Sequence, residues 1–378
     1  MPIQPIRHTR LLFALLVFGI ATLFCQLCIP YTLMQQESYA LFLTTPDYLR
    51  ETFAAPWPIA HLVGNFLVQF FHFPWVGPLI MGLLTALAYV LLSLPFRRKS
   101  FLLFSILVVG LLVVTSVWLT NINKVRAHER LSRVEYASIR HDWKKVLQTA
   151  TPEATRKDRQ LLPYALLALT ESGQLPDKMG RYPVRSVDDF CPEQWSDRRG
   201  LTFKAILYDC MGVPNEAIHN TFQAATSLSH GTSFGTLRAL VRLNRLKGDN
   251  LLANKYAAIL SHSTLHKGWG GKSEQRSVNS EQIIPSDAKQ SSDHSSLLTD
   301  HSSNHYSFIT NHFITPTYFY NVTSLLAHGV YTKTLADRSL CGLLVQGDLV
   351  RFRQMYALLP HAEGEPVPAL YREALDVK

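Results

Sequence analysis

The chain of 378 residues is long enough for two or three domains, and its composition is 47% hydrophobic and 17% charged. These averages cover two unlike parts: no Asp, Glu, Lys or Arg occurs between Glu51 and Arg97, whereas charged residues are frequent from Asn121 onward. The net charge of +9 does not indicate nucleic-acid binding, because the basic residues are dispersed along expected helices. Lys and Arg also flank membrane spans and meet anionic headgroups, so we expect membrane lipid as a partner and no nucleic acid.

Three uncharged segments are long enough to cross a bilayer as helices, which takes about twenty residues. The first, near 11–33, is too long for a cleaved signal peptide and has no small-residue cleavage site after it. The other two, near 76–96 and 101–120, are separated by only four residues, three of them basic. The sequence therefore predicts three spans, the last two forming a tight hairpin with a basic tip.

The apolar stretch 58–73 differs from these spans because polar residues recur along it in steps of four, four and three. At 100° per residue they form one polar stripe on a helix: His61, Asn65, Gln69 and His72. Such a helix can lie in the membrane interface with its stripe toward water, or cross the membrane with its stripe toward other helices or a substrate. Flanking prolines and tryptophans favour an amphipathic interfacial helix, and the stripe is the best candidate site of the membrane region.

Charge counting favours three spans over four. With three, the amino terminus and the basic tip are both cytoplasmic, as the positive-inside rule requires. Four spans would instead place Lys124, Arg126, Arg130 and Arg133 in the cytoplasm but the basic tip outside. We therefore expect the carboxyl-terminal domain to be extracytoplasmic.

The loop 35–56 is expected to contain one surface helix, with Thr44 or Thr45 as its cap and Pro46 in its first turn. Three acidic residues of this loop, Glu37, Asp47 and Glu51, are the catalytic candidates. Multi-pass glycosyltransferases that act on lipid-linked sugars place a general base in such a loop. This defines an alternative function, a polytopic membrane enzyme of that kind.

After residue 120 the pattern is helical and amphipathic, which predicts an α-helical repeat-like domain over 121–267. One long helix is expected at 122–149, and others at 159–173, 201–212, 215–228, 233–249 and 250–263. Gly173, Gly212 and Gly248 end successive helices at spacings of 39 and 36, near the 34-residue period of helix–turn–helix repeats. An irregular helical bundle is the alternative.

Residues 268–306 are rich in Ser, Gln, Asp and Lys and predict a disordered insertion, after which the helical domain continues over 307–378 with helices at 318–329, 333–346 and 348–359. His294, His301, His305 and His312, with Asp293 and Asp300, have no spacing that fixes a coordination shell, so we expect no metal site. Cys191, Cys210 and Cys341 allow one disulfide in an oxidising compartment. No phosphate loop, serine elbow or H-E-x-x-H motif occurs, so we expect no cofactor and no soluble-type enzyme.

The segments QQESYALFLTTPDYLRE and PWPIAHLVGNFLVQFFHFPWVGPLI, with the later DWKKVLQTA, LLPYALLALTESGQLPDKM and VPALYREAL, resemble an uncharacterised bacterial family of multi-pass inner-membrane proteins. That resemblance implies many spans followed by a tetratricopeptide-like helical region. This chain departs from it by having few spans, as though a central membrane block were missing. It implies location in the bacterial inner membrane, and no activity or residue role.

Taken together, these features predict an all-α chain in which a transmembrane region anchors a helical-repeat scaffold for a protein partner. Concave surfaces of helical repeats commonly bind extended peptides or helices. Transport is the least favoured function, since three spans from one chain enclose no pathway.

Overall fold

The structure is a computed structural model that describes residues 4–96, 98–192, 195–228, 231–265, 332–359 and 367–377. All regular elements in these ranges are helices, which confirms the all-α fold class. The chain divides into two compact units, each described here by itself. Unit 1 contains Met1–Tyr136, Leu228–Arg238 and Ala258–Lys267; unit 2 contains the remainder. The predicted disordered insertion and its histidines lie outside the described residues.

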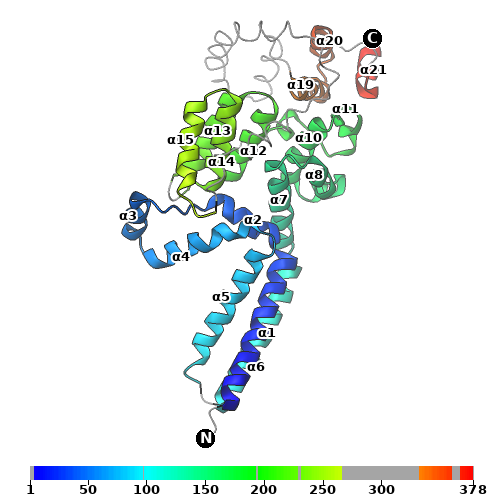
Figure 1. The fold of residues 1–378 in the computed structure, drawn as a ribbon. Helices are drawn as coiled ribbons and strands as arrows, with labels where there is room; N and C mark the ends of the chain where they lie inside the picture. The colour runs from blue at the N-terminus through cyan, green and yellow to red at the C-terminus, as the bar shows by residue number, and fades with distance from the viewer. Residues whose placement is uncertain are drawn as a thin grey trace. The chain divides into compact units, whose positions relative to one another are not determined.

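Three helices of unit 1 are long and apolar enough to cross a membrane: α1 (Gln4–Cys28), α5 (Val76–Ser93) and α6 (Arg98–Asn121). They pack side by side (Figure 1) around Val17, Tyr89 and Phe101. Many leucine and valine side chains of these helices are exposed, as is expected of helices that face lipid.

The first span ends earlier than expected. The sequence predicted a span near 11–33, but α1 stops at Cys28 and a second helix, α2 (Pro30–Tyr39), begins at once. Pro30 is the reason, because a proline cannot donate the backbone hydrogen bond that would continue α1 and is favourable at the start of a helix.

Two short helices connect α2 to the second span. The helix α3 (Pro46–Ala54) has Thr45 at its N-cap position and Pro46 at its start, as predicted, although the Thr45 side chain makes no capping hydrogen bond. The helix α4 (Pro58–Val68) continues into a 3₁₀ turn, η1 (Gln69–His72). An α-helix of 11 residues is about 16 Å long, which is too short to cross a bilayer.

The helix α7 (Asn123–Ile139), which follows the third span, holds α2 through buried polar contacts within unit 1. The Glu129 carboxylate accepts hydrogen bonds from the backbone N–H groups of Tyr31 and Thr32 at 2.8 and 3.0 Å, so it caps the amino end of α2. About two turns further along α2, the Tyr39 hydroxyl donates to the fully buried Glu135 at 2.7 Å. These charge-assisted bonds fix α2 firmly onto α7.

Unit 2 contains pairs of helices joined by tight turns. Its helices, two of which also extend into unit 1, are α8 (Trp143–Thr149), α9 (Pro152–Lys157), α10 (Leu162–Glu171), α11 (Leu175–Lys178), α12 (Arg198–Cys210), α13 (Pro214–Thr226), α14 (Phe234–Leu246), α15 (Asn250–Ser261), α19 (Lys333–Gln346), α20 (Leu349–Leu358) and α21 (Ala369–Asp376). Three 3₁₀ turns accompany them: η2 (Arg159–Leu161), η3 (Met179–Arg181) and η4 (Val187–Asp189).

The same type of turn follows five helices: α7, whose last residues lie in unit 2, and α10, α12, α14 and α19. One residue of each turn has a positive φ, namely His141 (53°), Gly173 (64°), Gly212 (76°), Gly248 (85°) and Gly347 (75°). The residue after each donates its N–H to the carbonyl five residues earlier, at 2.8 to 3.0 Å: Asp142 to Ala137, Gln174 to Leu169, Val213 to Tyr208, Asp249 to Asn244, and Asp348 to Leu343. This is the Schellman motif, in which a left-handed residue satisfies the last carbonyls of a helix.

The first of these turns corrects the prediction of one long helix at 122–149. The chain leaves α7 at His141, and the Asp142 side chain accepts a hydrogen bond from the N–H of Lys145 to start α8. The aspartates of the turns at Gly248 and Gly347 cap their second helices in the same way. His141 therefore occupies a position where the chain elsewhere has glycine.

Candidate functional site

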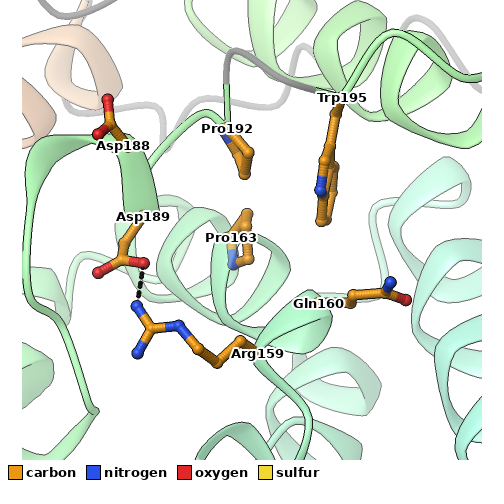
Figure 2. A pocket seen from close by; sticks show the side chains of 7 residues that line it. All are labelled: Arg159, Gln160, Pro163, Asp188, Asp189, Pro192 and Trp195. Atoms are coloured by element: carbon orange, nitrogen blue, oxygen red, sulfur yellow. Dashed lines mark hydrogen bonds and ion pairs between the residues drawn. The ribbon is translucent and has the colours of Figure 1, made fainter.

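A pocket of about 360 Å³ lies within unit 2 and is the site best supported by the described residues. Figure 2 shows the indole of Trp195 nearly edge-on, so that one face looks toward the rings of Pro163 and Pro192. Four polar residues complete the lining: Arg159, Gln160, Asp188 and Asp189. The pocket thus has apolar ring walls and a polar edge.

Close packing fixes the indole in place. Trp195 contacts the rings of Tyr164 and Phe203, with centroid distances of 6.2 and 5.7 Å. Behind it lies Gly200 in the first turn of α12, where an added Cβ would come within 2.4 Å of the Trp195 Cβ and 2.7 Å of its carbonyl oxygen. Only glycine allows this approach, so the sequence Trp-x-x-x-x-Gly itself positions the pocket wall.

The polar edge contains an ion pair between Arg159 and Asp189, which holds η4 in place, and one exposed carboxylate, that of Asp188. The Arg159 guanidinium donates to Asp189 Oδ1 at 2.5 Å, while Asp189 Oδ2 accepts the backbone N–H groups of Arg185 and Ser186. Both oxygens of Asp189 are therefore occupied by bonds that hold η4 in place. Asp188 is exposed, and it accepts a hydrogen bond of 3.4 Å from the Ser186 hydroxyl.

Charged residues also gather at the helix ends elsewhere in unit 2. Asp209 pairs with Arg242 and lies 3.7 Å from His141 Nε2. Burial raises the pKa of Glu171, although the hydroxyl of Thr334 donates to this carboxyl and opposes the shift. Burial also raises the pKa of the Cys210 thiol well above its ordinary value, which leaves it protonated and poorly nucleophilic at neutral pH.

One arginine of this unit, Arg338, is buried. The Arg338 guanidinium donates to the backbone carbonyl of Phe190 at 2.6 Å and lies 5.2 Å from the centroid of the Phe190 ring. These contacts with Phe190 link the end of η4 to α19, and the same guanidinium also donates to the Thr170 hydroxyl at 3.5 Å.

The polar stripe predicted from the sequence lies on α4 and η1. The Asn65 amide donates to the Tyr48 hydroxyl at 3.1 Å, and the fully buried Gln69 accepts from the Thr264 hydroxyl at 2.5 Å. His61 is exposed, whereas His72 is half-buried with its ring 5.5 Å from that of Phe73. Two of the four residues thus contact other parts of unit 1.

The three acidic candidates lie on two different helices. Glu37, on α2, is 2% exposed and accepts a hydrogen bond from Arg238 at 2.9 Å. Asp47 and Glu51 are exposed on α3, one turn apart. The described residues include no group of three or more His, Cys, Asp or Glu side chains that could hold a metal ion. None of the five cysteines, all of which are described, forms a disulfide.

Comparison with known proteins places the chain in a family. Residues 6–125 and 115–377 match the model of a family of unknown function, DUF6057. The chain belongs to this family. No curated protein and no solved structure matches it.

Sequence reasoning did not find the Trp195 pocket. Its residues come from η2, the start of α10, η4 and the coil before α12, so no helical period connects them. The available signal was the short segment CPEQWSDRRG, which combines a proline, a tryptophan and the glycine that the indole requires.

Proposed function

We propose that this protein is a membrane-anchored helical scaffold whose unit 2 binds a segment of a protein partner. The observation that carries the proposal is the pocket with a fixed indole and proline walls in an otherwise well-packed helical unit. Tryptophan dominates the energetics of protein interfaces because it contributes a large, rigid apolar surface.

We further propose that unit 2 is a tetratricopeptide-like repeat array. Five helix pairs share the same left-handed turn, and three of them share the aspartate cap of the second helix. A turn that recurs with the same hydrogen bonds supports a repeated helix–turn–helix unit. The match in two pieces, 6–125 and 115–377, is also what a missing central membrane block would produce.

The location proposed for this protein is the bacterial inner membrane, with three spans and unit 2 on the extracytoplasmic side. Within unit 1, the Arg10 guanidinium donates to the Phe96 carbonyl at 3.0 Å and lies 5.3 Å from the Phe101 ring. The basic amino terminus therefore lies at the same end of the spans as the basic hairpin tip. The positive-inside rule assigns this end to the cytoplasm.

Two of the four basic residues after the third span, Arg126 and Arg133, make contacts within unit 1. The Arg133 guanidinium lies 4.8 Å from the centroid of Tyr31, and the Arg126 Nε donates to the Thr120 carbonyl at 2.5 Å. These contacts do not remove the positive charge. The orientation therefore rests on the larger number of basic residues at the opposite end of the spans, Arg7, Arg10, Arg97, Arg98 and Lys99.

Membrane lipid is the second partner that we propose, through the α3–α4 region. Its large apolar side chains are exposed, among them Phe53 (56%), Trp57 (81%), Ile59 (70%) and Trp75 (66%). The opposite side of α4 bonds to Tyr48 and leads into the buried Gln69. A short helix with exposed aromatic residues, directly before a span, is typical of an in-plane interfacial helix.

Site-specific photo-crosslinking in living cells tests the scaffold proposal. A photoreactive amino acid at the exposed Gln160, on the pocket edge, should yield one defined crosslinked protein. The same probe at the exposed Asp376, on α21, serves as the matched control and should not yield that product. Absence of any defined product from Gln160, or identical products from both positions, would contradict partner binding at the pocket.

No specific observation favours the alternative of a membrane enzyme acting on lipid-linked sugars. Among its candidate bases, Glu37 is engaged by Arg238, and Asp47 and Glu51 lie on a separate short helix. We therefore propose the scaffold function alone.

A further inference from the structure

We infer that the Trp195 pocket takes a proline of an extended partner segment that carries a basic residue next to that proline. This inference rests on the proposed function and names the chemistry of the partner at the same site. It follows from the walls of the pocket, the charge at its edge and the rigidity of the indole.

The walls favour a proline ring. Three ring surfaces line the pocket, those of Trp195, Pro163 and Pro192, and Figure 2 shows the indole face turned toward the two prolines. A flat, rigid slot between rings suits a side chain that is itself a ring and loses no rotamer freedom on binding. Grooves lined by aromatic residues recognise proline-rich segments for this reason, since such segments are extended before they bind.

The charge at the pocket edge favours a basic neighbour. Arg159 and Asp189 neutralise each other, and both oxygens of Asp189 are already bonded. The exposed Asp188 carboxylate therefore gives the lining its net negative charge; Figure 2 shows it at the edge of the pocket, pointing away from the two prolines. The side chain of a Lys or Arg next to the bound proline would be attracted to this carboxylate, whereas an acidic residue at that position would be repelled.

A sugar fits the pocket less well, although tryptophan also stacks on sugar rings. Recognition of a sugar requires several polar groups aimed at its hydroxyls. Here the strongest candidates, Arg159 and Asp189, are committed to holding η4, and only Asp188 and Gln160 remain. The lining therefore offers three apolar rings but few polar side chains that are not already used to hold η4.

The pocket wall is preorganised, which lowers the entropic cost of binding. Gly200 allows the backbone of α12 to press against Trp195, and Tyr164 and Phe203 support the indole from the side. A fixed wall is expected to retain its shape when the pocket is empty.

Peptide binding to the full chain in detergent micelles tests the inference by fluorescence anisotropy. The probe is a fluorescein-labelled decapeptide with a Pro-x-x-Pro core and two flanking arginines. Two matched peptides replace either the prolines with alanine or the arginines with glutamate, and a chitin tetrasaccharide competes as the sugar probe. We expect the alanine and glutamate peptides to bind at least tenfold more weakly, and the sugar not to compete.

Protein variants assign the effect to the pocket. Trp195→Ala should weaken the proline peptide at least tenfold. Because its loss also removes core contacts, the exposed Asp188→Arg provides the second test and should weaken the arginine peptide about fivefold, which is about 1 kcal/mol. Asp376→Arg, an exposed charge reversal on α21, is the control and should have no effect.

Three results would overturn the inference: equal binding of the proline and alanine peptides, no effect of Asp188→Arg, or displacement of the peptide by the sugar. These outcomes are distinguishable from failure of the proposed function. A defined crosslink from Gln160 with no proline dependence would leave the scaffold proposal standing and remove only the identity of its ligand.

Discussion

At the scale of single residues, the left-handed turn residues set where the helices of unit 2 end. Four of the five turns use glycine, which reaches a positive φ without steric cost. The fifth uses His141, whose ring lies edge-on to that of Trp143 at 5.3 Å and whose Nε2 is 3.7 Å from Asp209. His141 has a less favourable positive φ than glycine would have, but its side chain makes contacts that glycine cannot make.

Gly248→Ala tests this use of glycine. Its φ is 85° and an added Cβ would meet no atom within 4 Å, so the cost comes from the backbone alone. We expect the free energy of unfolding to fall by about 1 kcal/mol, since alanine in the left-handed region is strained. The midpoint of urea unfolding, followed by the helical circular dichroism of the full chain, measures the effect.

Gly180→Ala is the matched control for that experiment. Gly180 also has open space around its Cβ position but does not have a positive φ. Alanine there should be neutral or stabilising by up to about 1 kcal/mol, because it reduces the entropy of the unfolded chain. Equal losses of stability at Gly180 and Gly248 would show that the added methyl group itself, and not the backbone conformation, causes the loss.

At the scale of helices, α1 and α5 approach each other closely at Gly82. An added Cβ there would lie 2.0 Å from the Thr22 hydroxyl and 2.9 Å from the Phe18 carbonyl. The side chain of Thr22 can rotate away, but the Phe18 carbonyl belongs to the backbone of α1. Gly82→Ala must therefore move the two helices apart, and such small-residue contacts stabilise helices packed in lipid.

We expect Gly82→Ala to destabilise the membrane helices by about 1–3 kcal/mol, the usual cost of overpacking. Thermal aggregation of the full chain in detergent measures the change, and Thr22→Ala should rescue it only in part. Gly110→Ala, on α6 with open space around its Cβ position, is the control and should leave the midpoint unchanged. A loss of similar size at Gly110 would contradict the close approach at Gly82.

The helices show what the sequence could and could not predict. The two carboxyl-terminal helices predicted at 333–346 and 348–359 are found at Lys333–Gln346 and Leu349–Leu358, because glycine and aspartate mark the turn between them. The break after α7 was missed, since His141 carries no comparable signal. The turn can be recognised in the sequence only when RHDW is aligned with KGDN and QGDL of the later turns.

The candidate site and the buried charges needed contacts that no local pattern contains. The sequence around Glu129 and Glu135 is typical of a solvated helix, yet each carboxylate bonds to a residue of α2 almost one hundred positions earlier. The pocket likewise combines residues separated by up to 36 positions, from Arg159 to Trp195. The three helices that are long and apolar enough to cross a membrane were predicted from the sequence, because this property depends on the length and composition of one continuous segment.

At the scale of the whole molecule, the account requires the three spans to leave the carboxyl-terminal unit outside the cytoplasm, where its partner segment would be met. The basic amino terminus and the hairpin tip at the same end of the spans support this orientation. The location of the partner, and therefore every search for it, depends on this orientation.

Cysteine labelling in intact cells tests this claim most directly. In a chain whose five native cysteines are replaced, Ser100→Cys and Asp376→Cys each introduce one thiol at an exposed position. The account predicts that a membrane-impermeant maleimide labels Asp376→Cys in intact cells and labels Ser100→Cys only after the inner membrane is permeabilised. Labelling of Ser100→Cys in intact cells, with Asp376→Cys protected until permeabilisation, would contradict it.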